Sequence, residues 1–209
     1  MKISSYTTLI RELPHLQQAF DIKRSIWKVP HQQELVDEIF VNEEVIRINR
    51  GDVFNSNSNI ERFIISTLMW GYPTKGRGNN IDRMLEPKHF DYLASVLQHF
   101  KDNVNMPSHQ IEDHLGIVPG LGLSTITKFL YFLDITIDNQ PALILDNQII
   151  KVINSKRFEE LQPLEGIRYD NGPLRYPDYL YEMNLIADQL KVDPGQLEYF
   201  LFTFGNQLS

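Results

Sequence analysis

The sequence contains no cysteine among its 209 residues. This absence excludes disulfide bonds and metal sites built on thiolates, including cysteine-held iron–sulfur clusters. The six histidines are scattered without the close spacing of a zinc site, so we expect no catalytic metal held by side chains. No apolar run is long enough to cross a bilayer, and Met1 to Ser5 lead into mixed sequence instead of the apolar core of a signal peptide. We therefore expect a cytoplasmic protein with no membrane partner.

Basic residues are outnumbered by acidic ones, and the net charge of −7 argues against a nucleic-acid partner. The basic residues are nevertheless grouped. One group comprises Lys75, Arg77, Arg83 and Lys88, and another comprises Lys151, Lys156 and Arg157, with no acid among residues 147–157. The acids concentrate after Arg157, in a distribution typical of a solvated face. The net charge therefore does not exclude DNA binding.

The chain has 42% hydrophobic residues, enough to bury one sizeable core, so we expect a single compact domain over residues 1–209. Apolar residues recur mostly at helical spacing, which predicts a mainly α fold. The expected helices cover residues 4–13, 30–40, 60–69, 87–100, 108–115, 123–133, 146–154, 177–191 and 195–204. Ser58 and Glu61 form a predicted capping box for the helix at 60–69. Residues 45–48 and 53–54 flank Arg50-Gly51-Asp52 and predict a small β-hairpin.

The chain is organised around the segment Ile117 to Thr125, which reads Ile-Val-Pro-Gly-Leu-Gly-Leu-Ser-Thr. It joins a short helix to a long apolar run through a tight Pro-Gly-x-Gly bend. Glycine tolerates positive φ and lets another group come close, so Gly120 and Gly122 mark a place where something approaches the main chain. The bend also opens a helix, whose free N–H groups bind anions without a lysine. We expect the approaching group to be a phosphate.

This pattern resembles a helix-hairpin-helix DNA-binding element, at about residues 108–133. The resemblance extends through residues 142–154, where the strand-like apolar run Ala142 to Leu145 precedes Asp146 and another helix. Helix-hairpin-helix DNA glycosylases keep the same order of hairpin, apolar run and aspartate. The overall layout is similar to 8-oxoguanine glycosylases, while Gly-x-Gly-x-Ser-Thr with Ile-Leu-Asp is most similar to adenine glycosylases. The absence of cysteine departs from the latter, many of which carry an iron–sulfur cluster. The resemblance implies two helical lobes with the active-site cleft between them.

Asp146 is the catalytic residue that the resemblance implies. Followed by Asn-Gln-Ile-Ile, it is also a good helix N-cap, and capping alone is its ordinary structural role. The two roles are compatible, because a helix N-terminus favours the carboxylate form. A carboxylate stabilises the oxocarbenium character that the sugar develops as a base departs, and it can orient or deprotonate an attacking water.

Ser124 stands where bifunctional glycosylases carry the lysine that forms a Schiff base with the sugar. The nearest lysine, Lys128, lies one helical turn later on the same face, and a helix-surface position is its structural alternative. The resemblance therefore implies a monofunctional enzyme that uses water and leaves an abasic site. Ser124 is a candidate for positioning that water, and Lys128 is the candidate for any lyase activity.

The loop that runs from Trp70 to Asn80 gathers aromatic, glycine, basic and amide residues between apolar helices. It is either a flexible surface connection or a reading loop that contacts an extruded base. Trp70 and Tyr72 are the candidates for stacking, and Asn79 or Asn80 for the wedge that fills the gap in the duplex. In 8-oxoguanine glycosylases an aromatic residue of a C-terminal helix stacks on the base. Phe202 or Phe204 is the candidate for that role here, with core packing as the alternative.

Backbone and side-chain contacts to DNA phosphates are expected at the hairpin and at the nearby basic residues. The candidates are Lys75, Arg77, Val118, Gly120, Leu121, Gly122, Ser124, Thr125 and Lys151. Such hairpins commonly hold a monovalent cation, K⁺ or Na⁺, through carbonyl oxygens. The motif positions imply the carbonyls of Gly116, Val118 and Leu121, and no other cofactor is expected.

The resemblance thus implies a DNA glycosylase, acting as a monomer on double-stranded DNA, that flips out a damaged or modified base and hydrolyses its N-glycosidic bond. The alternative is a non-catalytic helix-hairpin-helix module that holds DNA for a partner. The two differ in whether Asp146 faces a pocket shared with Trp70 or Phe202, or faces solvent. The base itself stays open among oxidised, mismatched, alkylated and hypermodified phage bases, the last of which would indicate phage defence.

Overall fold

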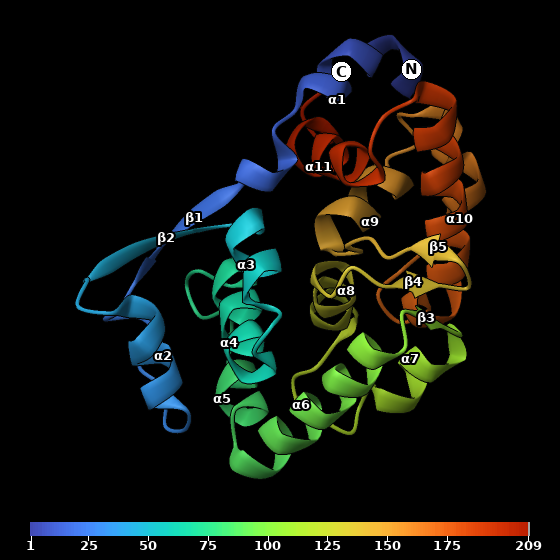
Figure 1. The fold of residues 1–209 in the computed structure, drawn as a ribbon. Helices are drawn as coiled ribbons and strands as arrows, with labels where there is room; N and C mark the ends of the chain where they lie inside the picture. Colours follow the sequence, from blue (N-terminus) through green and yellow to red (C-terminus); the bar gives the residue numbers. More distant parts are fainter. Residues whose placement is uncertain (209) are drawn as a thin grey trace.

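The computed structural model describes residues 1–208 and shows a mainly helical chain (Figure 1). The mainly α fold expected from the sequence is confirmed. The α-helices are α1 (Thr7–Glu12), α2 (Gln33–Phe40), α3 (Arg50–Ser56), α4 (Ile60–Gly71), α5 (Asn80–Met84), α6 (Pro87–Asp102), α7 (His109–His114), α8 (Leu123–Phe132), α9 (Asn147–Asn154), α10 (Gly172–Leu190) and α11 (Pro194–Phe204). The 3₁₀ helices are η1 (Ile3–Tyr6), η2 (His15–Gln17) and η3 (Glu159–Leu164). The strands are β1 (Ala19–Lys23), β2 (Val45–Asn49), β3 (Asn105–Met106), β4 (Thr136–Ile137) and β5 (Gln140–Pro141).

Helices α4 and α8 form the centre of the molecule and pack against each other (Figure 1). Ser124 is the one residue of α8 that is not buried, and α4 is buried without interruption from Phe63 to Trp70. Aromatic rings join the two helices, as between Phe63 and Phe129, whose centroids lie 6.0 Å apart. A helix with no polar face is stable only inside a core. The helix expected at residues 60–69 is therefore confirmed, and it belongs to the core.

Two groups of helices meet at this centre. Helices α2, α3 and α6 pack on α4, whereas α1, α9 and α10 pack on α11. The N-terminal segment belongs to the second group, because the backbone N–H groups of Ile3 and Ser4 donate to the Glu160 carboxylate at 3.0 and 3.2 Å. The groups are joined by a buried ion pair of 2.7 Å between Arg50 on α3 and Glu198 on α11. This arrangement agrees with the expected pair of helical lobes.

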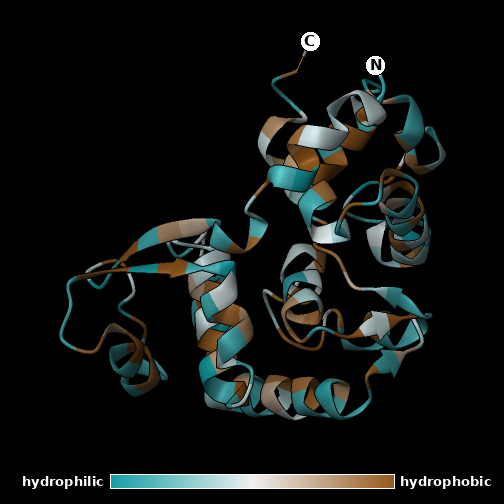
Figure 2. Cartoon of the chain, turned by 45° about the horizontal axis from the view of Figure 1, so that its top comes forward, coloured by the Kyte–Doolittle hydropathy of each residue, from teal (hydrophilic) through white to brown (hydrophobic). Residues whose placement is uncertain are grey.

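Strands β1 and β2 form an antiparallel ribbon beside α4, and the chain that connects them contains α2 (Figures 1 and 2). Ala19 pairs with Asn49, and Lys23 pairs with Val45. The hairpin predicted across Arg50-Gly51-Asp52 is therefore wrong. Those residues begin α3, because Asn49 and Asp52 form a capping box in which each side chain accepts the other residue's backbone N–H at 2.9 Å.

Two further boundaries differ from the sequence-based expectation. Asn59, and not Ser58, caps α4, and its side chain accepts the backbone N–H of Arg62 at 3.0 Å. Helix α10 begins at Gly172 instead of Pro177, because Pro173 takes the first turn and Pro177 is accommodated inside the helix. Within residues 1–208, no helix combines the length and the apolar character that a bilayer span needs.

Candidate active site

The hairpin lies between α7 and α8, and its two central glycines are approached by other parts of the protein. Gly120 has a φ of +90°, and a Cβ there would come within 2.6 Å of the Asn80 carbonyl oxygen. A Cβ on Gly122 would overlap the hydroxyl of Tyr169. The close approach expected at these glycines is thus made by α5 and by the loop before α10. Between the glycines, the Leu121 N–H donates to the Val118 carbonyl at 3.0 Å and closes the turn.

Asp146 caps helix α9. Its Oδ1 accepts the backbone N–H groups of Gln148 and Ile149 at 2.9 and 3.1 Å. These bonds leave Oδ2 free to face Lys128, whose Nζ lies 3.9 Å away. The side chain is only 15% exposed, so its charge acts in a partly desolvated setting. The predicted capping role is confirmed.

The segment before Asp146 is extended and is held by side chains of other helices. The Leu145 N–H donates to the Thr127 hydroxyl at 3.1 Å. The hydroxyls of Tyr176 and Tyr179 donate to the carbonyls of Leu143 and Ile144 at 2.7 and 2.8 Å. These bonds satisfy buried backbone groups that no neighbouring strand pairs with. They fix the position from which α9, and with it the Asp146 carboxylate, begins.

Lys128 is buried with 5% exposure, so the helix-surface alternative is wrong. Its ammonium donates to the Ser124 hydroxyl at 2.7 Å and to the Ser124 carbonyl at 3.1 Å. The ring of Tyr72 lies 5.6 Å from the same nitrogen, a cation–π contact. Gly71 provides the room, because a Cβ there would lie 2.9 Å from Cδ of Lys128. The amine is therefore directed toward Asp146 by contacts on several sides.

Asp146 and Lys128 line a narrow cavity between the two groups of helices. Phe20, Arg50, Trp70, Gly71, Lys128, Ile144, Asp146, Glu198 and Phe202 form its walls. Asp146 therefore faces a pocket shared with both Trp70 and Phe202, and its side chain is mostly shielded from solvent. Phe204 does not line this cavity; its ring packs at 5.9 Å from that of Phe200.

The charged pair Arg50 and Glu198 forms part of the same wall, and the sequence-based prediction missed it. The Arg50 guanidinium donates to Glu198 at 2.7 Å, to Gln18 at 2.7 Å and to the Tyr131 hydroxyl at 3.3 Å. Burial raises the pKa of Glu198, and the Arg50 guanidinium opposes that rise. One signal was present in the sequence, since Glu198 is the single charged residue in the mostly apolar run from Leu197 to Phe204. Such a residue is buried only with a partner.

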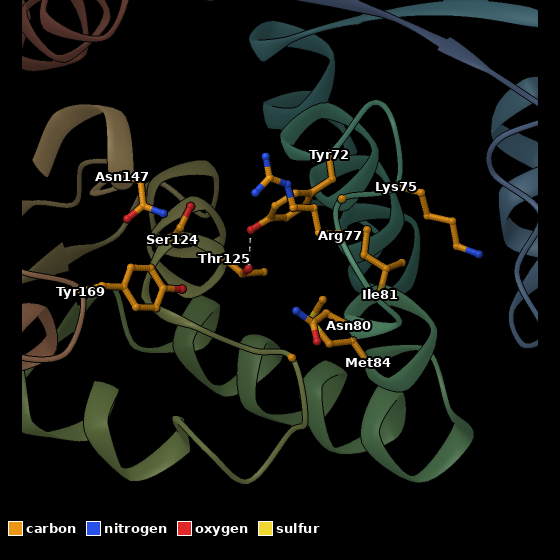
Figure 3. Close-up of a pocket in the computed structure, with 12 residues that line it drawn as sticks. Tyr72, Lys75, Arg77, Asn80, Ile81, Met84, Ser124, Thr125, Asn147 and Tyr169 are labelled. Atoms are coloured by element: carbon orange, nitrogen blue, oxygen red, sulfur yellow. Dashed lines mark hydrogen bonds between the residues drawn. The ribbon is translucent and has the colours of Figure 1, made fainter. Parts of the chain in front are cut away.

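A second hollow opens beside the cavity, between the loop after α4 and the N-terminal ends of α8 and α9 (Figure 3). Its walls include Tyr72, Arg77, Asn80, Gly120, Ser124, Thr125, Asn147 and Tyr169. The hydroxyls of Tyr72 and Thr125 are hydrogen-bonded at 2.6 Å, which ties the loop to the hairpin helix. Burial raises the pKa of the Tyr169 phenol, whose hydroxyl lies at the start of α8. Tyr169 and Asn147 are further residues that the prediction missed.

The other residues predicted to contact DNA lie around this hollow, and they differ in whether the protein itself already binds or buries them. Lys75 points away from it (Figure 3), and its Nζ is bound to the Asp82 carboxylate at 2.7 Å and the Lys28 carbonyl at 2.6 Å. Arg77, Asn79 and Lys151 are exposed. Val118 and Leu121 are buried, so only their backbone groups are available to a ligand, and Gly116 is exposed with a φ of +88°. Among residues 1–208, no three His, Asp or Glu side chains gather in a metal-binding cluster.

Comparison with known proteins gives one family match. The family is described as "Putative 8-oxoguanine DNA glycosylase OGG-like protein", and its model matches residues 14–202. The matched region includes the hairpin, Asp146, Lys128 and the whole cavity. No curated protein and no solved structure matches the chain.

Proposed function

Because the chain belongs to the 8-oxoguanine DNA glycosylase OGG-like family, we propose that it releases a damaged or modified base from double-stranded DNA by hydrolysing the N-glycosidic bond. The observation that carries the proposal is the placement of Asp146. Its carboxylate is fixed by the N-terminus of α9 and opens into a cavity that also holds Lys128, Trp70 and Phe202. In this cavity a flipped base can stack on the aromatic rings, beside a carboxylate whose negative charge stabilises positive charge on the sugar.

In the proposed reaction, the bond between C1′ and the base nitrogen breaks and its electron pair leaves with the base. The sugar develops positive charge, which the Asp146 carboxylate stabilises. At about 4 Å and an effective dielectric near 20, that interaction is worth roughly 4 kcal/mol. A water then bonds to C1′ and gives its proton to the Asp146 carboxylate or to solvent. The product is an abasic site in an intact strand.

Hydrolysis without a covalent amine intermediate is the proposed route, and Ser124 and Lys128 both support it. Ser124 offers a hydroxyl where a lysine would act as nucleophile. The Lys128 ammonium has three N–H groups and donates hydrogen bonds to two oxygens of Ser124. In these bonds Lys128 acts as a hydrogen-bond donor and not as a nucleophile. In this position its positive charge favours the negative charge that develops on the departing base.

DNA contact is proposed along the second hollow. The N-terminus of α8 offers backbone N–H groups to a phosphate, and the exposed side chains of Arg77 and Lys151 add charge. A K⁺ or Na⁺ ion bound by the carbonyls of Gly116, Val118 and Leu121 belongs to the same proposal. Carbonyl oxygens suit such ions, and the Val118 carbonyl would use its second lone pair, since its first accepts the Leu121 N–H.

The family description supports 8-oxoguanine as the first substrate to test. The experiment uses matched duplexes that carry 8-oxoguanine, an adenine mismatched with 8-oxoguanine, an alkylated purine or a hypermodified cytosine. Abasic sites are scored after alkali. We expect release of one class of base and little cleavage before alkali. Binding of all duplexes without release of any base would favour the non-catalytic module instead.

Asp146→Asn tests the residue on which the proposal rests. The amide keeps a capping oxygen but removes the charge, so base release should fall by about a hundredfold or more. Duplex affinity should stay within a few-fold of wild type. Asp193→Asn is the matched control, because Asp193 caps α11 with the same geometry, accepting Gly195 N–H at 2.7 Å and Gln196 N–H at 3.3 Å, and lies outside the cavity. Release by Asp146→Asn at the wild-type rate would make Asp146 a cap and nothing more.

A further inference from the structure

The N-terminal end of α8, where phosphate contact is proposed, has no capping side chain of its own. Its N-cap residue is Gly122, which has no side chain to accept a hydrogen bond. The Gly122 carbonyl accepts the N–H groups of Thr125 and Ile126 at 2.9 and 3.0 Å. The N–H groups of Leu123 and Ser124, in the first turn, have no carbonyl of the helix to bind. They need an acceptor from another part of the protein or from a ligand.

The hydroxyl of Tyr169 lies at this end of α8. It stands so close to Gly122 that a Cβ there would overlap it. A hydrogen bond with the Ser124 backbone opposes the rise that burial causes in the pKa of Tyr169. Figure 3 shows the Tyr169 ring reaching into the second hollow with its hydroxyl foremost. The phenol oxygen thus lies where the end of a helix otherwise binds an anion.

Gly122 makes room for this contact and is not required by the backbone conformation. Its φ of −110° and ψ of 177° describe extended backbone, which any residue can adopt. A side chain at this position would collide with Tyr169. The glycine whose pattern predicts the approach of a phosphate therefore admits a phenol of the same protein.

The Tyr169 side chain can leave this position while the loop that carries it stays in place. The loop is closed by the Asn171 side chain, which accepts the Arg168 N–H at 2.7 Å and donates to the Gly166 carbonyl at 3.0 Å. Neither bond involves the Tyr169 side chain. Tyr169 is also 45% exposed, so rotation about its χ1 angle carries the ring toward solvent.

We propose that Tyr169 is an autoinhibitory latch, which occupies the phosphate-binding end of α8 in the free protein and rotates away when DNA binds. The inference rests on the proposed glycosylase function and adds a regulatory contact to it. A DNA phosphate can bind the N–H groups of Leu123 and Ser124 only after the phenol has left them. Binding of any duplex therefore breaks a hydrogen bond within the protein. The latch weakens binding to damaged and undamaged DNA alike, and so shortens the time spent on undamaged DNA.

Tyr169→Phe tests the latch, because it keeps the ring and removes the oxygen. The free variant has no hydrogen bond to break at Ser124, so it should bind damaged and undamaged duplexes about fivefold more tightly than wild type, as one ordinary hydrogen bond would cause. Affinity is measured by fluorescence anisotropy at one salt concentration. Tyr181→Phe, the same change at a residue of α10 that is 55% exposed, is the control and should bind like wild type. Tyr169→Leu also lacks the oxygen and should tighten binding as well.

The sign of the change in affinity decides the matter. Weaker binding by the Tyr169 variants would show that the phenol itself contacts DNA, and would overturn the latch. Unchanged affinity in variants that melt cooperatively would overturn it too, as would a gain confined to duplexes with one base, because the latch acts on phosphate contact. These three outcomes leave the glycosylase function intact. Failure of wild type to bind any duplex would instead overturn the proposed function, and the latch with it.

Discussion

At the scale of single residues, Lys128 shows how a side chain's surroundings decide its chemistry. Its position one turn after Ser124 could be read from the sequence, but its burial could not, because a lysine on an amphipathic helix ordinarily reaches solvent. Gly71, Tyr72 and Ser124 enclose it, and the first two belong to a helix end and loop more than fifty residues away in sequence. No local pattern encodes such an enclosure.

Lys128→Met is expected to slow base release on the order of a hundredfold, because it keeps the packed stem and removes a charge aimed at the departing base. Lys2→Met, at an exposed residue, is the control. Release is measured in a single turnover. In parallel, borohydride should trap no covalent complex with wild-type protein, since hydrolysis forms no Schiff base. A trapped complex that disappears in Lys128→Met would instead identify Lys128 as a nucleophile and the enzyme as bifunctional.

At the scale of elements, the features that the sequence predicted are those with local signals. The hairpin boundaries follow from Pro119, Gly120 and the apolar run that follows, and the start of α11 follows from Asp193-Pro194. The β1–β2 ribbon was missed because its paired residues lie far apart in the sequence, as do Asp21 and Arg47, which are 26 positions apart and whose side chains form an ion pair at 3.1 Å. The partners of Arg50 were missed for the same reason. Glu198 lies 148 residues further along the chain.

The two hairpin glycines with positive φ give a matched pair of substitutions. Gly116 has a φ of +88° with open space around it, whereas Gly120 has a φ of +90° and faces the Asn80 backbone at 2.6 Å. Alanine costs roughly 1 kcal/mol at either position for its conformation, and at Gly120 the clash adds to that. Gly120→Ala should therefore melt several degrees below Gly116→Ala in calorimetry.

DNA binding by the same pair checks the proposed role of the hairpin. Gly120→Ala displaces the turn that opens α8, so it should weaken binding to damaged and undamaged duplexes alike at a fixed salt concentration. Gly116→Ala should weaken binding to these duplexes to a smaller extent. A loss confined to one base identity would show that the hairpin reads sequence, contrary to a phosphate-binding role.

At the scale of the whole molecule, three buried tyrosines make stability depend on alkaline pH. Burial raises the pKa of Tyr131 to about 12, and it raises the pKa of Tyr176 and Tyr179 as well. Unfolded tyrosine titrates near pH 10, so above that pH the unfolded chain loses protons that the folded chain keeps. Stability should therefore fall as the pH rises above 10, by about 1.4 kcal/mol per pH unit for each such tyrosine.

Urea unfolding between pH 9 and 11.5 measures this slope. Tyr131→Phe removes one of the three phenols, so its slope should be smaller by about 1.4 kcal/mol per pH unit up to pH 12. The variant also loses the hydrogen bond to Arg50, which changes its stability at every pH. The free energy of unfolding of each protein is therefore compared with its own value at neutral pH. A free energy of unfolding that stays constant over the range would show that these phenols ionise as readily in the folded protein as in the unfolded chain.

The N-terminal segment packs against the second group of helices, and this has a consequence for biosynthesis. Ile3 is bound to Glu160 at 3.0 Å, and the Arg11 carbonyl accepts from Gln196 at 2.7 Å. On a ribosome, Ile3 and Arg11 therefore emerge before their partners, which are translated more than 150 residues later. Loop closure over such a separation is slow relative to local helix formation. These two segments should thus meet late, after α4 and α8 have already packed against each other.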